Sequence, residues 1–273
     1  DEIYDQVVTI NNQSLQYFDR PLSNIVFMGM GEPLMNYNNL VKSIEMISSD
    51  KGLNISQKRI VVSTSGIPKM IKKLADENLK VNLALSLHSA IEETRNNIMP
   101  FSSKFPLNDI KESLDYWYSK TKRKITFEYI VWRGINDTKK DIDSLVSYCK
   151  SIPSKVNIIE YNSIGDEDFK SANDNIIEEY KRALEKNKIT VTVRRSRGKD
   201  IDAACGQLAN KWIYFLLLFD AAIRALYAFT ILPVLEMLLN GIFSLPAWST
   251  LILTSIPLSR MISFNFAADI FGK

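Results

Sequence analysis

Residues 59–87, RIVVSTSGIPKMIKKLADENLKVNLALSL, decide the fold class of this chain. The segments 59–64 and 81–87 are short runs rich in Val, Ile and Leu, as β-strands are. Between them, over 68–78, apolar residues recur every three or four positions, and the proline at the start suits a first helical turn. The stretch therefore predicts a strand, a helix and a second strand parallel to the first.

The same alternation runs through most of the chain at a spacing of roughly 30 residues. Strands are predicted at 24–30, 59–64, 81–87, 124–131, 155–161 and 189–195. Helices are predicted at 40–47, 68–78, 107–118, 138–150 and 176–184, the fourth of these capped by Asp137. Right-handed crossovers then leave a doubly wound sheet or a barrel, and the periodicity does not choose between them. Segments 24–30 and 81–87 are almost continuously apolar, which is typical of strands covered on both faces.

Composition describes a globular protein with 46% apolar and 24% charged residues. The net charge of +3 permits a nucleic-acid partner without arguing for one. The two cysteines, Cys149 and Cys205, lie far apart, which excludes a disulfide framework and fits a reducing compartment. We therefore expect a cytoplasmic location.

Two regions differ in character, 1–211 with the alternating pattern and 212–273 with a strongly apolar one. Residues 237–259 carry no charge and are numerous enough to cross a bilayer, although Gly and Pro interrupt them. The sequence leaves open whether this tail is a membrane hairpin, a helix on a membrane surface, or a chimeric or frameshifted end.

Polar and glycine residues follow four of the predicted strands. These are GMGEP at 29–33, STSG at 63–66, SLHS at 86–89 and YNS at 161–163. Because the carboxyl ends of parallel strands meet at one edge, where ligands bind in such folds, the four segments predict one ligand site.

Taken in order, GMGEPLMNYNNL (29–40), STSG, LSLH (85–88) and RGKDIDAACGQL (197–208) resemble the RlmN/Cfr family of radical S-adenosylmethionine (SAM) RNA methyltransferases, on its RlmN side. The resemblance covers about 1–211. It implies an α/β fold, a partial (β/α) barrel with a [4Fe–4S] cluster on a CxxxCxxC motif and SAM on the open iron site. This chain has no such motif, and so no metal ligands are assigned. We expect a barrel truncated before residue 1, without its first strand and cluster loop, and inactive by itself.

The resemblance also assigns site residues, all at strand ends except for one cysteine. SAM would be bound by Gly31, Glu32, Ser63, Ser86, Leu87, His88 and Asn162. A carboxylate suits the ammonium of the methionine moiety, and hydroxyl, amide and backbone groups suit ribose and carboxylate oxygens. The only histidine, His88, is assigned to binding and not to proton transfer. Cys205 would be the catalytic residue, accepting a methyl group before it passes to RNA.

Three further features of the sequence are interpreted apart from SAM binding and methyl transfer. Cys149 lies on the apolar face of its predicted helix, which favours a structural role. The basic residues Arg194, Arg195, Arg197 and Lys199 form either a phosphate contact or a solvated strand end. Trp132, with Arg133 beside it, is a candidate for stacking on a splayed base.

The implied reaction is methylation of adenine carbon 2 in 23S rRNA, with tRNA as a second substrate. It consumes two SAM molecules and needs a flavodoxin-type electron donor, and we expect a monomer. Membrane contact through the tail is a lesser alternative. The competing hypothesis is a non-catalytic fragment that at most binds RNA.

Overall fold

A computed structural model describes residues 1–28, 31–162 and 169–195. The chain divides into the units Asp1–Ala204 and Cys205–Lys273, and the described residues all belong to the first. The predicted boundary at 211/212, the apolar tail and Cys205 lie outside the described residues. Within the described ranges, no helix combines the length and the apolar character that crossing a membrane requires.

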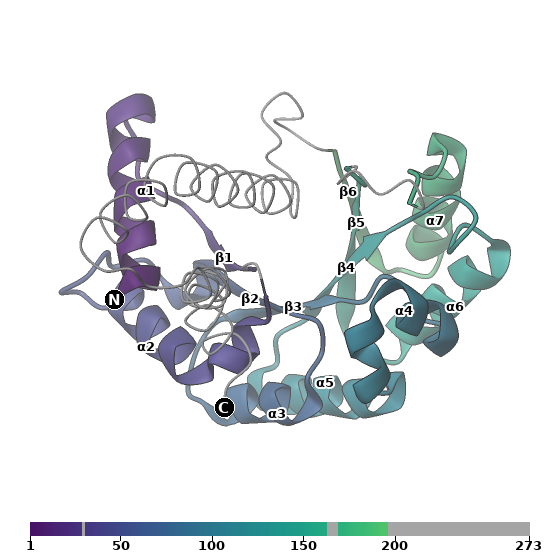
Figure 1. Ribbon diagram of the computed structural model, residues 1–273, viewed down its shortest axis with the longest axis horizontal. Helices are drawn as coiled ribbons and strands as arrows, with labels where there is room; N and C mark the ends of the chain where they lie inside the picture. The colour runs from purple at the N-terminus through teal and green to yellow at the C-terminus, as the bar shows by residue number, and fades with distance from the viewer. Residues whose placement is uncertain (29–30, 163–168, 196–273) are drawn as a thin grey trace, which may run out of the picture. The chain divides into compact units, whose positions relative to one another are not determined.

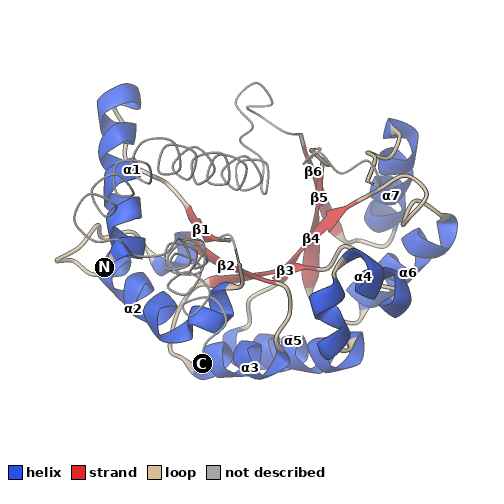
Figure 2. Ribbon diagram, viewed as in Figure 1, coloured by secondary structure: helices blue, strands red, loops and turns tan. Residues whose placement is uncertain are grey.

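Six parallel strands form one sheet, and their order in space is their order in the chain (Figure 1). They are β1 (Ile25–Phe27), β2 (Ile60–Thr64), β3 (Asn82–Ser86), β4 (Ile125–Ile130), β5 (Ser154–Ile159) and β6 (Thr190–Arg194). All six predicted strands are confirmed. The sheet follows an arc with the helices α2 to α7 along its outer side (Figure 2). The described chain is therefore a partial barrel and not a doubly wound sheet.

The five predicted helices are present as α2 (Tyr37–Ser48), α3 (Pro68–Asp76), α5 (Leu107–Thr121), α6 (Lys139–Lys150) and α7 (Asp174–Lys186). Two more were not predicted, α1 (Glu2–Phe18) and α4 (Glu92–Ile98). Short 3₁₀ turns lie at Pro33–Asn36, Gln57–Arg59 and Pro100–Lys104.

Two local expectations were wrong. The helix α6 is capped by Thr138 and not by Asp137, because Thr138 forms a capping box with Asp141. Strand β1 is not covered on both faces, since it is an edge strand of the described sheet and its Val26 is 48% exposed.

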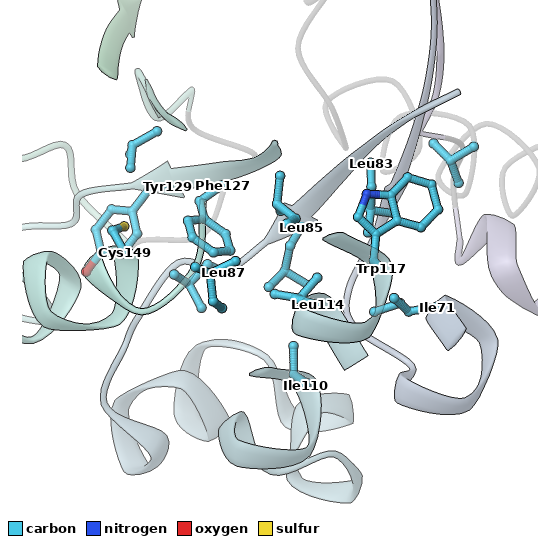
Figure 3. Close-up of a cluster of buried hydrophobic side chains, with 14 of the residues drawn as sticks. Ile71, Leu83, Leu85, Leu87, Ile110, Leu114, Trp117, Phe127, Tyr129 and Cys149 are labelled. Carbon is cyan, nitrogen blue, oxygen red and sulfur yellow. The ribbon is translucent and has the colours of Figure 1, made fainter. Parts of the chain in front are cut away.

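The core lies between the sheet and the outer helices. Figure 3 shows Leu83, Leu85 and Leu87 in one cluster with side chains of α5, among them Trp117 and Ile110. Because side chains alternate between the faces of a strand, Ser86 points to the opposite, inner side. Apolar side chains of the strands thus pack against the outer helices, and polar side chains such as Ser86 lie on the inner face.

Candidate functional site

The loops after β1 and β2 are joined by the carboxylate of Glu32. Its Oε2 accepts hydrogen bonds from the backbone N–H and the hydroxyl of Ser65, both at 2.7 Å. Its Oε1 accepts from the N–H of Leu34 at 3.1 Å, which caps the 3₁₀ turn at Pro33–Asn36. A carboxylate offers about four lone-pair sites, so Glu32 retains acceptor capacity for a ligand.

A buried guanidinium joins the loops after β2 and β3. Arg95 of α4 is fully buried, and its Nη2 donates to the carbonyls of Ser65 at 2.5 Å and Ser86 at 3.5 Å. Its Nε donates to the carbonyl of Leu87 at 3.2 Å. Burial lowers the pKa of Arg95, although this group keeps its charge at any ordinary pH. One cation therefore holds two of the predicted binding loops against each other.

Glycine is required in the STSG loop. Gly66 has φ +102°, and a Cβ there would lie 2.9 Å from Ile110 Cδ1 and 3.0 Å from Leu85 Cδ1. The loop therefore turns directly over the core. The surroundings of Gly31 are different, since an added Cβ would meet no atom of the described residues within 4 Å. That leaves open space next to Glu32.

His88, a predicted binding residue, is held as a neutral imidazole. Its φ is +55°, and its Nδ1 accepts a hydrogen bond from the N–H of Ile130 at 3.3 Å. Burial, reinforced by the charge of Arg95, lowers the pKa of His88 to about 4. Since Nδ1 is the acceptor, the single proton of the neutral ring is on Nε2. His88 can thus donate a hydrogen bond but is a poor base at neutral pH.

Asn136 locks the loops after β3 and β4 together. It is fully buried, and its Nδ2 donates to the carbonyls of His88 at 2.7 Å and Ile130 at 2.9 Å. Its Oδ1 accepts from the N–H of Trp132 at 2.7 Å. No sequence motif pointed to Asn136 or to Arg95, because each joins a backbone group near it in the chain to one 30 or more residues away.

Aromatic rings continue the contact to the loop after β5. The Trp132 ring lies 5.6 Å from that of His88, 6.0 Å from Tyr161 and 5.5 Å from Phe169. Asn162 follows Tyr161 and donates from Nδ2 to the carbonyl of Glu160 at 3.2 Å. Trp132 is only 5% exposed, so the expected stacking surface for a splayed base is already covered by these rings.

A buried acid lies on the inner face of the sheet. Glu128 of β4 is in register with Ser86 of β3 and Asn157 of β5, and it is 5% exposed. Its Oε1 accepts from Asn157 Nδ2 at 2.9 Å, whereas its Oε2 is buried without a hydrogen-bond partner. Burial raises the pKa of Glu128, and the bond from Asn157 opposes this. A charged residue inside an apolar predicted strand was a signal that the sequence offered.

The structure brings the predicted binding residues to the carboxyl ends of neighbouring strands. Ser63, 3% exposed, lies near the end of β2, Ser86 is the last residue of β3, and the other predicted residues follow β1, β3 and β5. In the described part, most of the buried polar atoms without a partner lie at the same ends: Arg95 Nη1, Glu128 Oε2, Trp132 Nε1 and Tyr161 Oη. Buried polar groups are normally satisfied, so this concentration indicates a place for ligand groups.

The remaining candidates are the two cysteines and the basic residues at and after the end of β6. Cys149 is 3% exposed, and burial raises the pKa of its thiol to about 12, which confirms the expected structural role. Arg195 pairs with Asp174 at 2.8 Å, and Arg194 ends β6. Cys205, Arg197 and Lys199 lie outside the described residues.

Comparison with known proteins finds similar ones. Proteins called probable dual-specificity RNA methyltransferase RlmN are 65% identical over 211 residues in Christiangramia forsetii and 64% identical over 212 residues in Flavobacterium psychrophilum. Over this stretch the chain is similar to proteins of the RlmN family. No protein-family model matches it. A crystal structure of a radical SAM methyltransferase from Sphaerobacter thermophilus agrees, with 34% identity and a TM-score of 0.73 over 76% of this chain and 60% of that one.

The RlmN-family match has a defined extent. The match with the Christiangramia relative covers 77% of this chain and 60% of that relative. The match with the Flavobacterium relative covers 78% of this chain and 61% of that relative. The chain thus spans about three-fifths of the length of these relatives.

SAM and a [4Fe–4S] cluster are the cofactors of RlmN-type radical SAM enzymes. The described residues fit the first, because acceptors, donors and unpartnered polar atoms converge at the strand ends. They do not fit the second. The described part holds no group of three or more potential metal ligands, and Cys149 is buried in the core. With only one other cysteine in the sequence, the chain has no ligand set for a cluster.

Proposed function

We propose that this chain forms the SAM-binding part of a radical SAM enzyme that methylates carbon 2 of adenine in 23S rRNA, with tRNA as a second substrate. The observation that carries the proposal is the network from Glu32 through Ser65, Arg95 and His88 to Tyr161. It ties together five loops that follow neighbouring strands, and it contains polar atoms that lack a protein partner. Similarity to the RlmN family supplies the reaction class.

Each binding residue has a role that its surroundings permit. Glu32 accepts a hydrogen bond from the ligand ammonium with its remaining lone pair, and the open space at Gly31 admits that group. Ser63 and Ser86 offer hydroxyls, Leu87 and His88 offer backbone groups, and His88 adds its Nε2–H. Asn162 supplies an amide. When bound, SAM supplies an electrophilic methyl group.

We assign Cys205 as the residue that first accepts this methyl group. Carbon 2 of adenine is not a nucleophile, whereas a thiolate is a good one. Cys205 would release its thiol proton to solvent and present the thiolate sulfur to the electrophilic methyl group that bound SAM would supply. Arg194, Arg195, Arg197 and Lys199 precede Cys205 and favour the thiolate by their charge.

The reductive half of the reaction needs an iron–sulfur cluster and an electron donor of the flavodoxin type. Because the chain has no ligand set for a cluster, we expect the chain alone not to perform that half. This observation also supports the second candidate, a non-catalytic fragment that at most binds RNA.

Binding of SAM is the first test. Equilibrium dialysis with radiolabelled SAM compares the parent with Glu32→Gln and with Glu45→Gln, an exposed acid on α2 that serves as the control. We expect Glu32→Gln alone to weaken binding about tenfold, the cost of one charge-assisted hydrogen bond of about 1.4 kcal/mol. Equal binding by all three proteins would refute the assignment of Glu32.

Chemistry at Cys205 is the second test. The N-terminal part of the Christiangramia relative is joined before residue 1, and the purified chimera is examined by peptide mass spectrometry. We expect a methyl group on the Cys205 peptide and none on Cys149. RNA methylation should be lost in Cys205→Ala and kept in Cys149→Ala. Methylated RNA from the Cys205→Ala chimera would refute the mechanism.

A further inference from the structure

The amino edge of the sheet, opposite the candidate site, carries a second concentration of charge. The loops that lead into β2, β3 and β4 read QKR at 57–59, KVN at 80–82 and KRK at 122–124, and none of these segments contains an acid. We call their charged residues the basic rim: Lys58, Arg59, Lys80, Lys122, Arg123 and Lys124. Because the strands are parallel, segments that precede them meet at one edge.

Hydrogen bonds hold these three loops next to each other. The N–H of Lys80 donates to Gln57 Oε1 at 2.8 Å, and Asn82 Nδ2 donates to the carbonyl of Lys58 at 2.7 Å. Arg123 Nη1 donates to Asn82 Oδ1 at 3.4 Å. Arg123 is half-buried, and the other five members are exposed. The rim is therefore one continuous surface and not a set of scattered side chains.

Helix dipoles explain only part of this charge. Cations at the carbonyl end of a helix are favoured, which accounts for Lys120 in the last turn of α5, outside the rim, and within the rim only for Lys122, the C-cap of α5. Lys80 comes four residues after α3 ends at Asp76, and Lys124 comes three after α5 ends at Thr121, beyond the reach of that effect.

The two acids shortly before Lys80 in the chain are engaged with other groups. Asp76 accepts from the Tyr116 hydroxyl at 2.6 Å and pairs with Lys120 at 3.6 Å. Glu77 accepts from the Tyr37 hydroxyl at 3.0 Å. Six positive charges in a chain whose net charge is +3 are thus gathered on one edge with little local compensation.

We propose that the basic rim binds RNA phosphates, as a second contact surface for the same RNA that meets the candidate site. The proposal rests on the proposed function. Interfaces with RNA and DNA are polar and strongly positive, whereas protein interfaces are centred on apolar or aromatic anchors. Among the described residues, none of the large apolar side chains that are exposed belongs to the rim loops. The rim is therefore suited to a phosphate backbone and not to an acidic protein.

The test uses the whole chain and a fluorescently labelled RNA hairpin copied from 23S rRNA. The rim variant carries Lys58→Gln, Lys80→Gln and Lys124→Gln. The control carries Lys42→Gln, Lys72→Gln and Lys111→Gln, in the middle turns of α2, α3 and α5. Both triple variants have the same net charge, so a difference between them reports position. Circular dichroism confirms that both are folded.

Anisotropy titrations from 50 to 300 mM salt give the affinity and its salt dependence. Each phosphate contact contributes about 0.7 in a single strand and about 0.9 in a duplex to the slope of log K against log salt, so the loss of three contacts on the hairpin should lower the slope by about 2 to 3. At 0.1 M salt its affinity should fall by roughly one to two orders of magnitude. The control should keep the slope of the parent.

The outcomes separate the two proposals. If the parent binds RNA and the two variants show the same affinity and slope, the rim proposal is overturned and the proposed function stands. If the parent does not bind RNA at all, the proposed function fails for this chain, and the rim proposal fails with it.

Discussion

Asn136 offers the sharpest test of how the candidate site is held together, through the substitution Asn136→Ala. The alanine removes the partners of three backbone groups, the buried N–H of Trp132 and the partly buried carbonyls of His88 and Ile130. A buried polar group left without its partner costs about 1–3 kcal/mol. Because water that enters the space would recover part of this loss, we expect a decrease of about 3–5 kcal/mol in the free energy of unfolding.

The assay is urea unfolding followed by circular dichroism, with Asn173→Ala as the matched control. Asn173 is exposed at the N-cap of α7, where its side chain makes no capping bond, and it accepts one hydrogen bond, from Arg133 Nη2 at 2.7 Å, so its replacement should cost about 0.5–1 kcal/mol. The variant Asn136→Asp keeps the acceptor Oδ1 but places a second oxygen against two carbonyls, and it should cost at least as much as alanine. If Asn136→Ala and Asn173→Ala agree to within about 1 kcal/mol, Asn136 does not lock the loops.

Three further predictions concern buried titratable groups. Burial raises the pKa of Glu128, so the folded parent holds that proton more tightly than the unfolded chain and loses stability as pH rises. The urea midpoint of Glu128→Gln should therefore rise relative to that of the parent as the pH increases from 4.5 to 7. A difference between the two midpoints that does not change with pH would contradict this. The pKa of His88 is lowered to about 4 from an ordinary value of about 6.5, so the folded chain loses stability as the pH falls. The parent should lose roughly 2–3 kcal/mol between pH 7 and 4.5 relative to His88→Gln, and parallel profiles would refute this assignment. Because burial raises the pKa of Cys149 to about 12, iodoacetamide at pH 8 should modify it at least about a hundredfold more slowly in the folded chain than in urea, as judged by peptide mass spectrometry, and equal rates would show that the thiol is accessible.

The strands were predictable because packing against helices requires long apolar side chains at alternate positions, as at Leu83 and Leu85. Strand β1 is shorter than predicted because an edge strand has only one neighbour in the described sheet to extend its hydrogen bonding. Helix α1 escaped prediction because no predicted strand precedes it, although its Tyr4 and Val7 pack against the core. Helix α4 has seven residues, too few for a periodic pattern to stand out.

The site was predictable to the extent that topology alone determines it. Parallel strands bring Glu32, Ser86 and Asn162 to one edge whatever their side chains do. Arg95 and Asn136 were not predictable, because their function depends on which carbonyls come within reach once distant loops have folded. Glu128 was predictable only in part. The sequence shows a charge within an apolar strand, but it does not show that Oε2 lacks a hydrogen-bond partner.

The identity of spatial order and chain order has a consequence for synthesis on the ribosome. Each strand from β2 to β6 pairs with the strand that was made just before it. A nascent chain can therefore add one strand and its helix at a time, without waiting for a later segment to fill a gap in the sheet. At about 5–20 residues per second, a unit of roughly 30 residues emerges every few seconds. A ribosome that pauses after β4 would hold a four-stranded intermediate in which every strand already has its final neighbours, apart from the one at the growing edge.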